Sequence, residues 1–147
     1  MDGAAAEIAR RHRAVGLVER APGLNGAIEA ARSVAQARGA TAVLVLPADL
    51  PAVSSTALDA LLEIIEDPDE PVVGLVADRH GTGTNALLLQ PPDVIEPAFG
   101  PDSRVRHQLA AIAVGARYVE RGGPLALDVD TPADLLAAEA ALGSIRG

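Results

Sequence analysis

The chain has 147 residues, of which 49% are hydrophobic and 22% charged, and its formal net charge at pH 7 is −8. The length suits one domain over residues 1–147, and the apolar content excludes a disordered chain. The negative charge excludes a general nucleic-acid binder, because affinity for phosphate backbones needs a basic surface. No apolar run reaches the roughly 18 residues of a membrane-spanning helix, and the first residues lack a signal-peptide pattern. We therefore expect a cytoplasmic protein, not bound to a membrane, that acts on a small molecule.

Two residue types are missing from the sequence. It has no cysteine, which excludes disulfides, thiolate metal sites and cysteine nucleophiles. All twelve basic residues are arginine, so neither a Schiff-base lysine nor the lysine of a Walker phosphate loop is available. The aromatic residues are Phe99 and Tyr118, which are too few for a base-stacking surface.

Apolar runs alternate with helical patterns along the chain, which is typical of an α/β domain with a mainly parallel sheet flanked by helices. Helices are predicted at residues 4–13, 25–38, 54–65 (capped by Ser54 or Ser55), 102–114 (capped by Asp102 or Ser103) and 132–142. Strands are predicted at residues 14–19, 41–46, 72–77, 85–89, 117–120 and 125–127. Residues 41–46, TAVLVL, are continuously apolar, which indicates a strand buried on both faces.

An aspartate follows this strand in the segment VLPADLPAVSS. Ligands of open α/β sheets bind at the carboxyl ends of strands, where Asp49 is expected. The flanking prolines stiffen the loop, which suits a carboxylate that holds a hard cation. A solvated aspartate that only caps the turn is the simpler interpretation, and the segment alone leaves both open.

The segment LALDVDTPADL holds further candidate carboxylates. Asp128 and Asp130 alternate along a strand end and therefore face opposite sides. Asp130 is accounted for by the start of the last helix, where Asp134 completes a capping pattern. Asp128 has no such local role. If its strand lies near the strand at 41–46, Asp49 and Asp128 could share a Mg²⁺ ion, which takes one or two carboxylates and completes its shell with phosphate oxygens and water.

The segment ADRHGTGTN is rich in glycine. It is not a Walker motif, because no lysine follows and a strand comes next. Its glycines let the backbone approach a ligand, and Thr82 and Thr84 supply hydroxyl donors. A mobile turn between two strands is an equally good interpretation.

In the segment FGPDSRVRHQLA, Gly100 and a proline precede a capped helix. The first turn combines free N–H groups, the hydroxyl of Ser103 and the arginines Arg104 and Arg106, which favours an anion site. The alternative is a plain cap with its arginines in solvent. His107 is the one histidine with a suggestive position, and three scattered histidines do not make a zinc site. The two loops and the two acidic segments together fit phosphoryl or nucleotidyl transfer, which needs positioning and metal charge.

In this order, the segments PGLNGAI, LVLPADLPAV, VADRHGTGTNALLL, FGPDSRVRH and LDVDTPADL resemble the guanylyltransferases of coenzyme F-420 biosynthesis over almost the whole chain. That family transfers GMP from GTP to phosphoenolpyruvate in bacteria, or to 2-phospho-L-lactate in archaea, and releases pyrophosphate. The pair GTGTNALLL and FGPDSRVRH is the specific part, whereas DLP and DVDTP occur in wider nucleotidyltransferase-like folds. The resemblance implies a nucleotidyltransferase-like fold of the nucleotide-diphospho-sugar transferase type.

The resemblance also implies a cofactor and residue roles. The residues expected to contact the phosphate and carboxylate of the acceptor are Thr84, Gly100 and Ser103. Asp49 and Asp128 are expected to be the catalytic residues, by holding the Mg²⁺ that bridges acceptor and nucleotide. Asn25, in GLNGAI, is expected near the nucleotide.

Members of this family begin with a strand, a basic loop, a helix and a second strand. The resemblance starts after them, which implies a domain that is incomplete at its N-terminus. The first of these strands would lie beside the strand at 41–46, and its absence would leave an open sheet edge. Such an edge favours a partner chain, and a homodimer is one arrangement that would cover it.

Three functions are compatible with these patterns. The first is transfer of GMP from GTP to phosphoenolpyruvate, giving enolpyruvyl-diphospho-guanosine, with 2-phospho-L-lactate as the alternative acceptor. The lysine-free, alanine- and arginine-rich composition fits a GC-rich bacterium and so favours phosphoenolpyruvate. The second is a truncated, non-catalytic binder of phospho-ligands. The third is a molybdopterin guanylyltransferase or a sugar-phosphate cytidylyltransferase, against which the GTGTN and FGPDS pair speaks.

Overall fold

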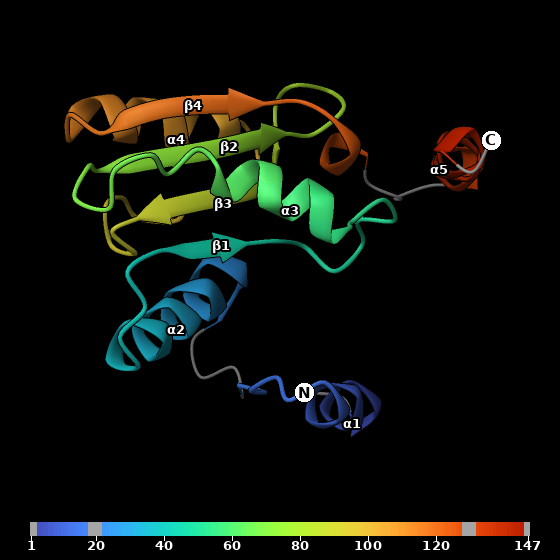
Figure 1. The fold of residues 1–147 in the computed structure, drawn as a ribbon, viewed down its shortest axis with the longest axis horizontal. Helices are drawn as coiled ribbons and strands as arrows, with labels where there is room; N and C mark the ends of the chain where they lie inside the picture. Colours follow the sequence, from blue (N-terminus) through green and yellow to red (C-terminus); the bar gives the residue numbers. More distant parts are fainter. Residues whose placement is uncertain (1–2, 18–21, 128–131, 146–147) are drawn as a thin grey trace.

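The computed structural model describes residues 3–17, 22–127 and 132–145 (Figure 1). The helices are α1 (Gly3–Arg11), α2 (Leu24–Ala37), α3 (Ser55–Leu62), α4 (Ser103–Ala113), the short 3₁₀ helix η1 (Pro124–Ala126) and α5 (Pro132–Ile145). The strands are β1 (Val43–Val45), β2 (Val72–Ala77), β3 (Thr84–Gln90) and β4 (Arg117–Arg121). Within the described residues these strands form one sheet in the order β1-β3-β2-β4, with helices against both faces. The predicted α/β class is therefore confirmed.

The sheet is mixed, and the prediction of a mainly parallel sheet was wrong. Strand β3 runs antiparallel to both of its neighbours, whereas β2 and β4 pair in parallel. The connections explain the difference. The segment 78–83 between β2 and β3 is short enough to be a hairpin loop, which forces antiparallel pairing, while the longer path through α4 brings β4 back parallel to β2.

Both faces of the sheet are buried in its centre, where every residue of β3 and all but the last residue of β2 are buried. Helix α3 covers one face and α4 covers the other (Figure 1). The cluster on the α3 side contains Leu61, Ile64, Val72, Val76, Ala86 and Leu88, and the cluster on the α4 side contains Val73, Leu75, Leu87, Leu89, Ile95 and Ala111. The alternation of neighbouring residues between the clusters is the period of two that a strand imposes. The sheet is thus a rigid base for the loops at its ends.

Strand β1 is less buried than its sequence predicts. It is the edge strand of the described sheet, with β3 as its neighbour, and all three of its residues are half-buried. Helix α2 packs against it, but a groove of about 370 Å³ stays open between the two. An apolar, β-branched run therefore indicated the strand correctly and its burial incorrectly, because burial depends on what covers the outer edge.

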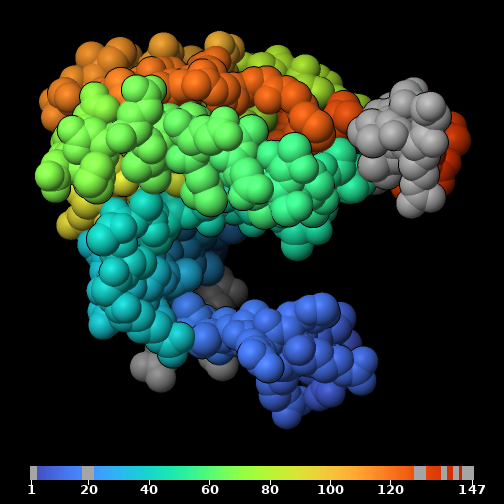
Figure 2. All heavy atoms as spheres, in the orientation of Figure 1, coloured from blue at the N-terminus to red at the C-terminus, as the bar shows by residue number. Residues whose placement is uncertain are grey.

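Two predicted strands differ from the structure. Residues 125–127 belong largely to η1, which begins with Pro124, and Leu125 is buried. Residues 14–17 form no strand, and 18–19 lie outside the described residues. Helix α1 buries none of its residues and projects from the rest of the chain (Figure 2). In the described parts of the chain, no helix has the length and hydropathy to cross a membrane.

Candidate functional site

A cleft of about 590 Å³ opens between α2, the segment after β1, the β2–β3 loop and the start of α4. Four of the predicted site residues line it, namely Asp49, Thr84, Gly100 and Ser103. Two polar residues that the sequence did not single out, Asp78 and Asn85, line it as well. The predicted Asp128 lies outside the described residues, and its role stays a prediction. The structure therefore brings together side chains that are more than fifty positions apart.

A register shift helps to place the hydroxyl of Thr84 in the cleft. The pairing of β2 with β3 shifts between Val76 and Ala77, so that Thr84 rather than Asn85 lies opposite Ala77. Such irregularities re-aim the side chains next to them. Both Thr84 and Asn85 line the cleft as a result, although neighbours on a regular strand would face opposite sides.

Thr84 is joined to Ser103 and His107 by a chain of buried hydrogen bonds. The Ser103 hydroxyl donates to Thr84 Oγ1 at 2.9 Å, and His107 Nδ1 lies 3.1 Å from the same oxygen. The three side chains are 8%, 1% and 0% exposed. On its other side, His107 Nε2 accepts the main-chain N–H of Ala98 at 2.9 Å. Ser103 was expected as a helix cap, but its hydroxyl is turned to Thr84 instead.

Burial lowers the pKa of His107 from its ordinary value near 6.5 to about 4, with a smaller contribution from the positive charge of Arg106. The imidazole is therefore neutral at pH 7. The ring also meets Phe99 edge to face, with centroids 5.2 Å apart. The neutral, fully buried ring thus contacts Thr84, Ala98 and Phe99, and these contacts hold the residues at this end of the cleft in place.

We expect the stability of the protein to fall as the pH is lowered from about 6.5 to about 4. The unfolded chain binds a proton at His107 near pH 6.5, whereas the folded chain binds it only near pH 4, so protonation favours the unfolded state in this window. Below about pH 4 this contribution stops growing. A pKa difference of this size corresponds to a loss of about 3 kcal/mol. Urea unfolding at a series of pH values measures it, and the His107→Gln variant should lack this component. Parallel curves for the two proteins across the window would contradict the prediction.

The loop that carries Gly100 is fixed from two sides. The Asn25 amide donates to the carbonyl of Phe99 at 3.0 Å and accepts its N–H at 2.8 Å. One residue earlier, Ala98 is bound by His107. Gly100 has a φ of +117°, in the range that favours glycine. The side chain of Asn25 thus shapes the loop at the cleft, and its predicted contact with a nucleotide stays a prediction.

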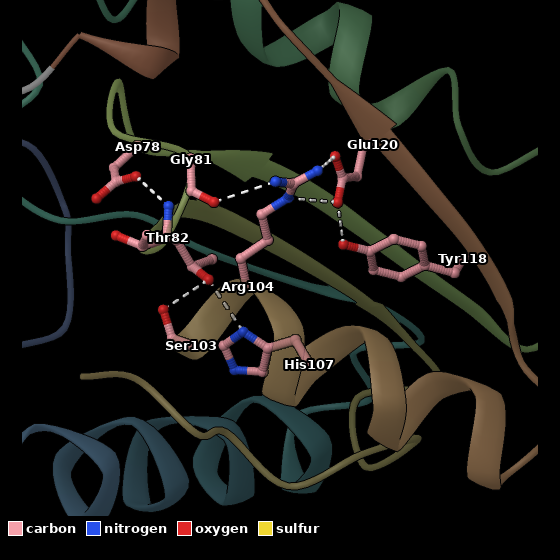
Figure 3. A network of polar contacts seen from close by, with 9 residues as sticks. Asp78, Gly81, Thr82, Ser103, Arg104, His107, Tyr118 and Glu120 are labelled. Atoms are coloured by element: carbon pink, nitrogen blue, oxygen red, sulfur yellow. Dashed lines mark hydrogen bonds and ion pairs between the residues drawn. The ribbon is translucent and has the colours of Figure 1, made fainter. Parts of the chain in front are cut away.

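The β2–β3 loop is held in a fixed shape by its first residue. Asp78 accepts the N–H of Thr82 at 2.9 Å (Figure 3). The main-chain N–H of Asp78 donates to the carbonyl of Gly83 at 3.2 Å. A Cβ at position 83 would lie 2.6 Å from the Asp78 carboxylate, so a side chain there would have to displace that carboxylate. Thr82 is exposed, whereas Thr84 is buried. The interpretation of this segment as a mobile turn does not fit these contacts.

Helix α4 begins against the same loop. The N–H of Arg104 donates to the carbonyl of Thr82 at 3.1 Å, and its guanidinium donates to the carbonyl of Gly81 at 3.1 Å. The N–H of Ser103 donates to the carbonyl of Gly100 at 3.1 Å. The expectation of free N–H groups in this first turn was therefore wrong for both residues, because the neighbouring loops take up those donors.

Arg104 is also committed to an ion pair. Its guanidinium grips both oxygens of Glu120 at 2.9 Å, and Tyr118 donates to the same carboxylate at 2.6 Å (Figure 3). Hydrogen bonding to Arg104 lowers the pKa of Glu120, and burial raises the pKa of Tyr118. Arg104 thus ties the β2–β3 loop to β4 and is not the free cation that the sequence predicted for an anion.

A second arginine ties the loop to α5. Arg79 forms an ion pair and a hydrogen bond with Asp134, whose side chain is 2% exposed. The sequence had assigned Asp134 to the cap of the last helix. This contact joins the first turn of α5 to the β2–β3 loop, which directly precedes Thr84 at the start of β3.

The cleft offers oxygen ligands for a divalent cation. The carboxylates of Asp49 and Asp78 both line it, and carboxylate oxygens are the ligands that Mg²⁺ prefers in proteins. Among the described residues, no three histidine, aspartate or glutamate side chains gather into a metal site. The donor set thus fits an ion that takes one or two carboxylates and draws its other ligands from phosphate and water.

A family model described as "Guanylyl transferase CofC like" matches residues 4–139. The chain belongs to this family. It is 43% identical over 141 residues to the phosphoenolpyruvate guanylyltransferase of Sphaerobacter thermophilus, which covers 94% of this chain and 67% of that protein. It is 48% identical over 119 residues to the enzyme of the same name from Conexibacter woesei, which covers 79% of this chain and 53% of that protein. The chain therefore spans between about half and two thirds of the length of these guanylyl transferase relatives.

A solved structure supports the fold of this guanylyl transferase family member. The chain is similar to the crystal structure of a putative nucleotide-diphospho-sugar transferase from Desulfovibrio desulfuricans G20, with a TM-score of 0.67 and 14% identity. The match covers 92% of this chain and 60% of that one. The predicted fold type is confirmed, and at this identity the likeness concerns the fold alone.

Proposed function

We propose that this protein transfers GMP from GTP to phosphoenolpyruvate, giving enolpyruvyl-diphospho-guanosine and pyrophosphate in coenzyme F-420 biosynthesis. The observation that carries the proposal is the meeting of Thr84, Gly100, Ser103 and Asp49 in one cleft. These residues come from three of the five segments that resemble the guanylyltransferases, and two of the three are the segments specific to that family. The names of the relatives support the same reaction and the same acceptor.

The acceptor end of the cleft suits a small molecule with a phosphate and a carboxylate. Thr84 and Ser103 offer hydroxyl groups, and Gly100 brings main chain to the surface without a side chain. The fixed loops at 78–83 and 98–100 hold these groups in place before a ligand arrives, which reduces the entropy cost of binding. Phosphate and carboxylate oxygens would accept from these donors.

The reaction needs orientation more than acid–base chemistry. A phosphate oxygen of phosphoenolpyruvate attacks the α-phosphorus of GTP in line, a new P–O bond forms, and pyrophosphate leaves with the electron pair of the broken bond. The attacking oxygen is already anionic at pH 7, so no side chain has to remove a proton. This is consistent with a cleft that holds His107 behind its wall and not at its surface.

We assign Asp49 to a Mg²⁺ ion, together with the predicted Asp128. Asp78 lines the same cleft and adds a carboxylate that the sequence did not single out. When bound, the ion would supply positive charge for the phosphates of both reactants. The protein's own contribution is to hold the carboxylates and the acceptor loops at one end of the sheet. Action in the cytoplasm and assembly as a homodimer stay predictions.

Pyrophosphate release tests the proposed function. The purified 147-residue chain is incubated with GTP and Mg²⁺, and with phosphoenolpyruvate or 2-phospho-L-lactate in separate reactions. We expect release with phosphoenolpyruvate, and mass spectrometry should identify enolpyruvyl-diphospho-guanosine. Release only with 2-phospho-L-lactate would overturn the assigned acceptor. If the folded chain binds GTP but no pyrophosphate is released in either reaction, the proposed guanylyl transfer is overturned.

A further inference from the structure

The hydroxyl groups at the acceptor end of the cleft have few protons to share. Thr84 and Ser103 carry one hydroxyl proton each, and the bond from Ser103 to Thr84 uses one of them. The remaining proton is therefore the only hydroxyl donor that the pair can offer to an anion. If Thr84 donates to Ser103 instead, one hydroxyl proton of the pair still remains free for an anion. What happens to the remaining proton depends on the third member of the chain, His107.

The main chain decides which nitrogen of His107 carries the proton. The N–H of Ala98 points at Nε2 at 2.9 Å, and an N–H can only donate, so Nε2 must be unprotonated. Because burial keeps the ring neutral at pH 7, its one proton lies on Nδ1. Nδ1 is 3.1 Å from Thr84 Oγ1 and therefore donates to it.

The opposite tautomer would have the opposite effect on the cleft. With its proton on Nε2, the ring would accept at Nδ1 and take up the remaining hydroxyl proton. The Thr84–Ser103 pair would then present only lone pairs to an anionic ligand, which is repulsive. The Nε2–H would also face the N–H of Ala98. The tautomer of His107, which does not line the cleft, thus determines whether the Thr84–Ser103 pair attracts or repels an anion in the cleft.

We propose that His107 is a positioning residue for the acceptor. By donating its Nδ1 proton to Thr84, it leaves the Thr84–Ser103 pair one hydroxyl proton that binds a phosphate or carboxylate oxygen. The inference rests on the proposed function for the identity of the ligand, but the hydrogen-bond chain exists without one. His107 acts through the pair, because it is fully buried and does not line the cleft.

The first test reads the tautomer in the native protein without ligand. In protein labelled with ¹⁵N-histidine, we expect the Nδ1 shift of a protonated nitrogen and the Nε2 shift of an unprotonated one for His107 at pH 7. The variant His107→Gln assigns the signals. The reverse pattern, or a doubly protonated ring, would overturn the inference whatever the reaction proves to be.

The second test asks whether His107 acts through Thr84. In His107→Met, the thioether sulfur can still accept weakly from the N–H of Ala98, but it has no proton to donate to Thr84. Calorimetry should show about tenfold weaker binding of phosphoenolpyruvate, and no further weakening when His107→Met is added to Thr84→Val. The exposed His12→Met is the matched control and should bind like the native protein. If His107→Met weakens binding equally with Thr84 and with Val at position 84, the positioning role is overturned.

The two proposals fail in different ways. If the native protein binds no phosphoenolpyruvate, the assigned acceptor is wrong, and the same cycle is run with inorganic phosphate as the probe. Dependence of phosphate binding on His107 through Thr84 would then support the positioning role without the proposed reaction. Phosphate binding that does not depend on His107 through Thr84 would overturn that role. If Thr84→Val does not fold, the tautomer measurement on the native protein still tests the inference.

Discussion

Asp49→Asn is expected to reduce pyrophosphate release at least about a hundredfold while the protein stays folded. Asp49 is exposed at the cleft after β1 and forms no hydrogen bond that the fold depends on within the described residues. Asparagine has almost the same shape but no charge, so a metal ion would lose most of its attraction to the site. The rate is measured with saturating GTP and phosphoenolpyruvate over a range of Mg²⁺ concentrations.

The control for this prediction is Asp59→Asn. Asp59 is an exposed aspartate on α3, outside the cleft, and its loss changes the net charge by the same amount. It should keep the native rate at every Mg²⁺ concentration. If Asp49→Asn also kept the native rate, Asp49 would not hold the ion and the metal assignment would fail.

Thr84→Val is expected to lower the free energy of unfolding by about 3 kcal/mol and to weaken the binding of phosphoenolpyruvate by about thirtyfold, which calorimetry can still measure. Valine fills nearly the same volume, so packing changes little. The hydroxyl of Ser103 and the Nδ1–H of His107 would both lose their acceptor in a buried site. Each unsatisfied buried donor costs about 1–3 kcal/mol. Urea unfolding measures the stability and calorimetry the binding.

Two further variants separate the role of the Thr84 hydroxyl from that of its methyl group. Thr84→Ser keeps the hydroxyl and should retain most of the stability and the binding. Thr82→Val makes the same change at an exposed threonine of the β2–β3 loop and should alter neither by much. A Thr84→Val protein as stable as the native one would show that the buried donors find other partners.

The sequence predicted the elements that local signals define. Strand β2 has the predicted bounds, and α5 begins at Pro132 as expected, because apolar β-branched runs and helix-start residues act over a few positions. The direction of β3 was not predicted, since it follows from the short loop before it and not from its own composition. Local patterns singled out the four cleft residues one by one, and the resemblance to a family assigned them to one site, because it carries long-range information that periodicity lacks.

The contacts that shape the site could not be predicted in the same way. His107 and Thr84 are 23 positions apart, and Arg79 and Asp134 are 55 apart. Asp134 lies two positions after Pro132, where a carboxylate also suits a helix start, so the sequence gave no sign of its contact with Arg79. Asp78 had one available signal, its place at the start of a glycine-rich loop, but only the fold shows that its carboxylate occupies the space beside Gly83.

The close approach of Gly83 to Asp78 limits which sequences can encode this loop. A side chain at position 83 would displace the carboxylate that holds the N–H of Thr82, so a single exchange at position 83 disturbs the loop. A shorter residue at position 78 would make room for that exchange but would lose the hydrogen bond. The two positions are therefore expected to change together or not at all. In a library randomised at positions 78 and 83, functional clones should carry exchanges at both positions more often than a single exchange at position 83. The sequence of this loop is therefore expected to change more slowly than that of other surface loops.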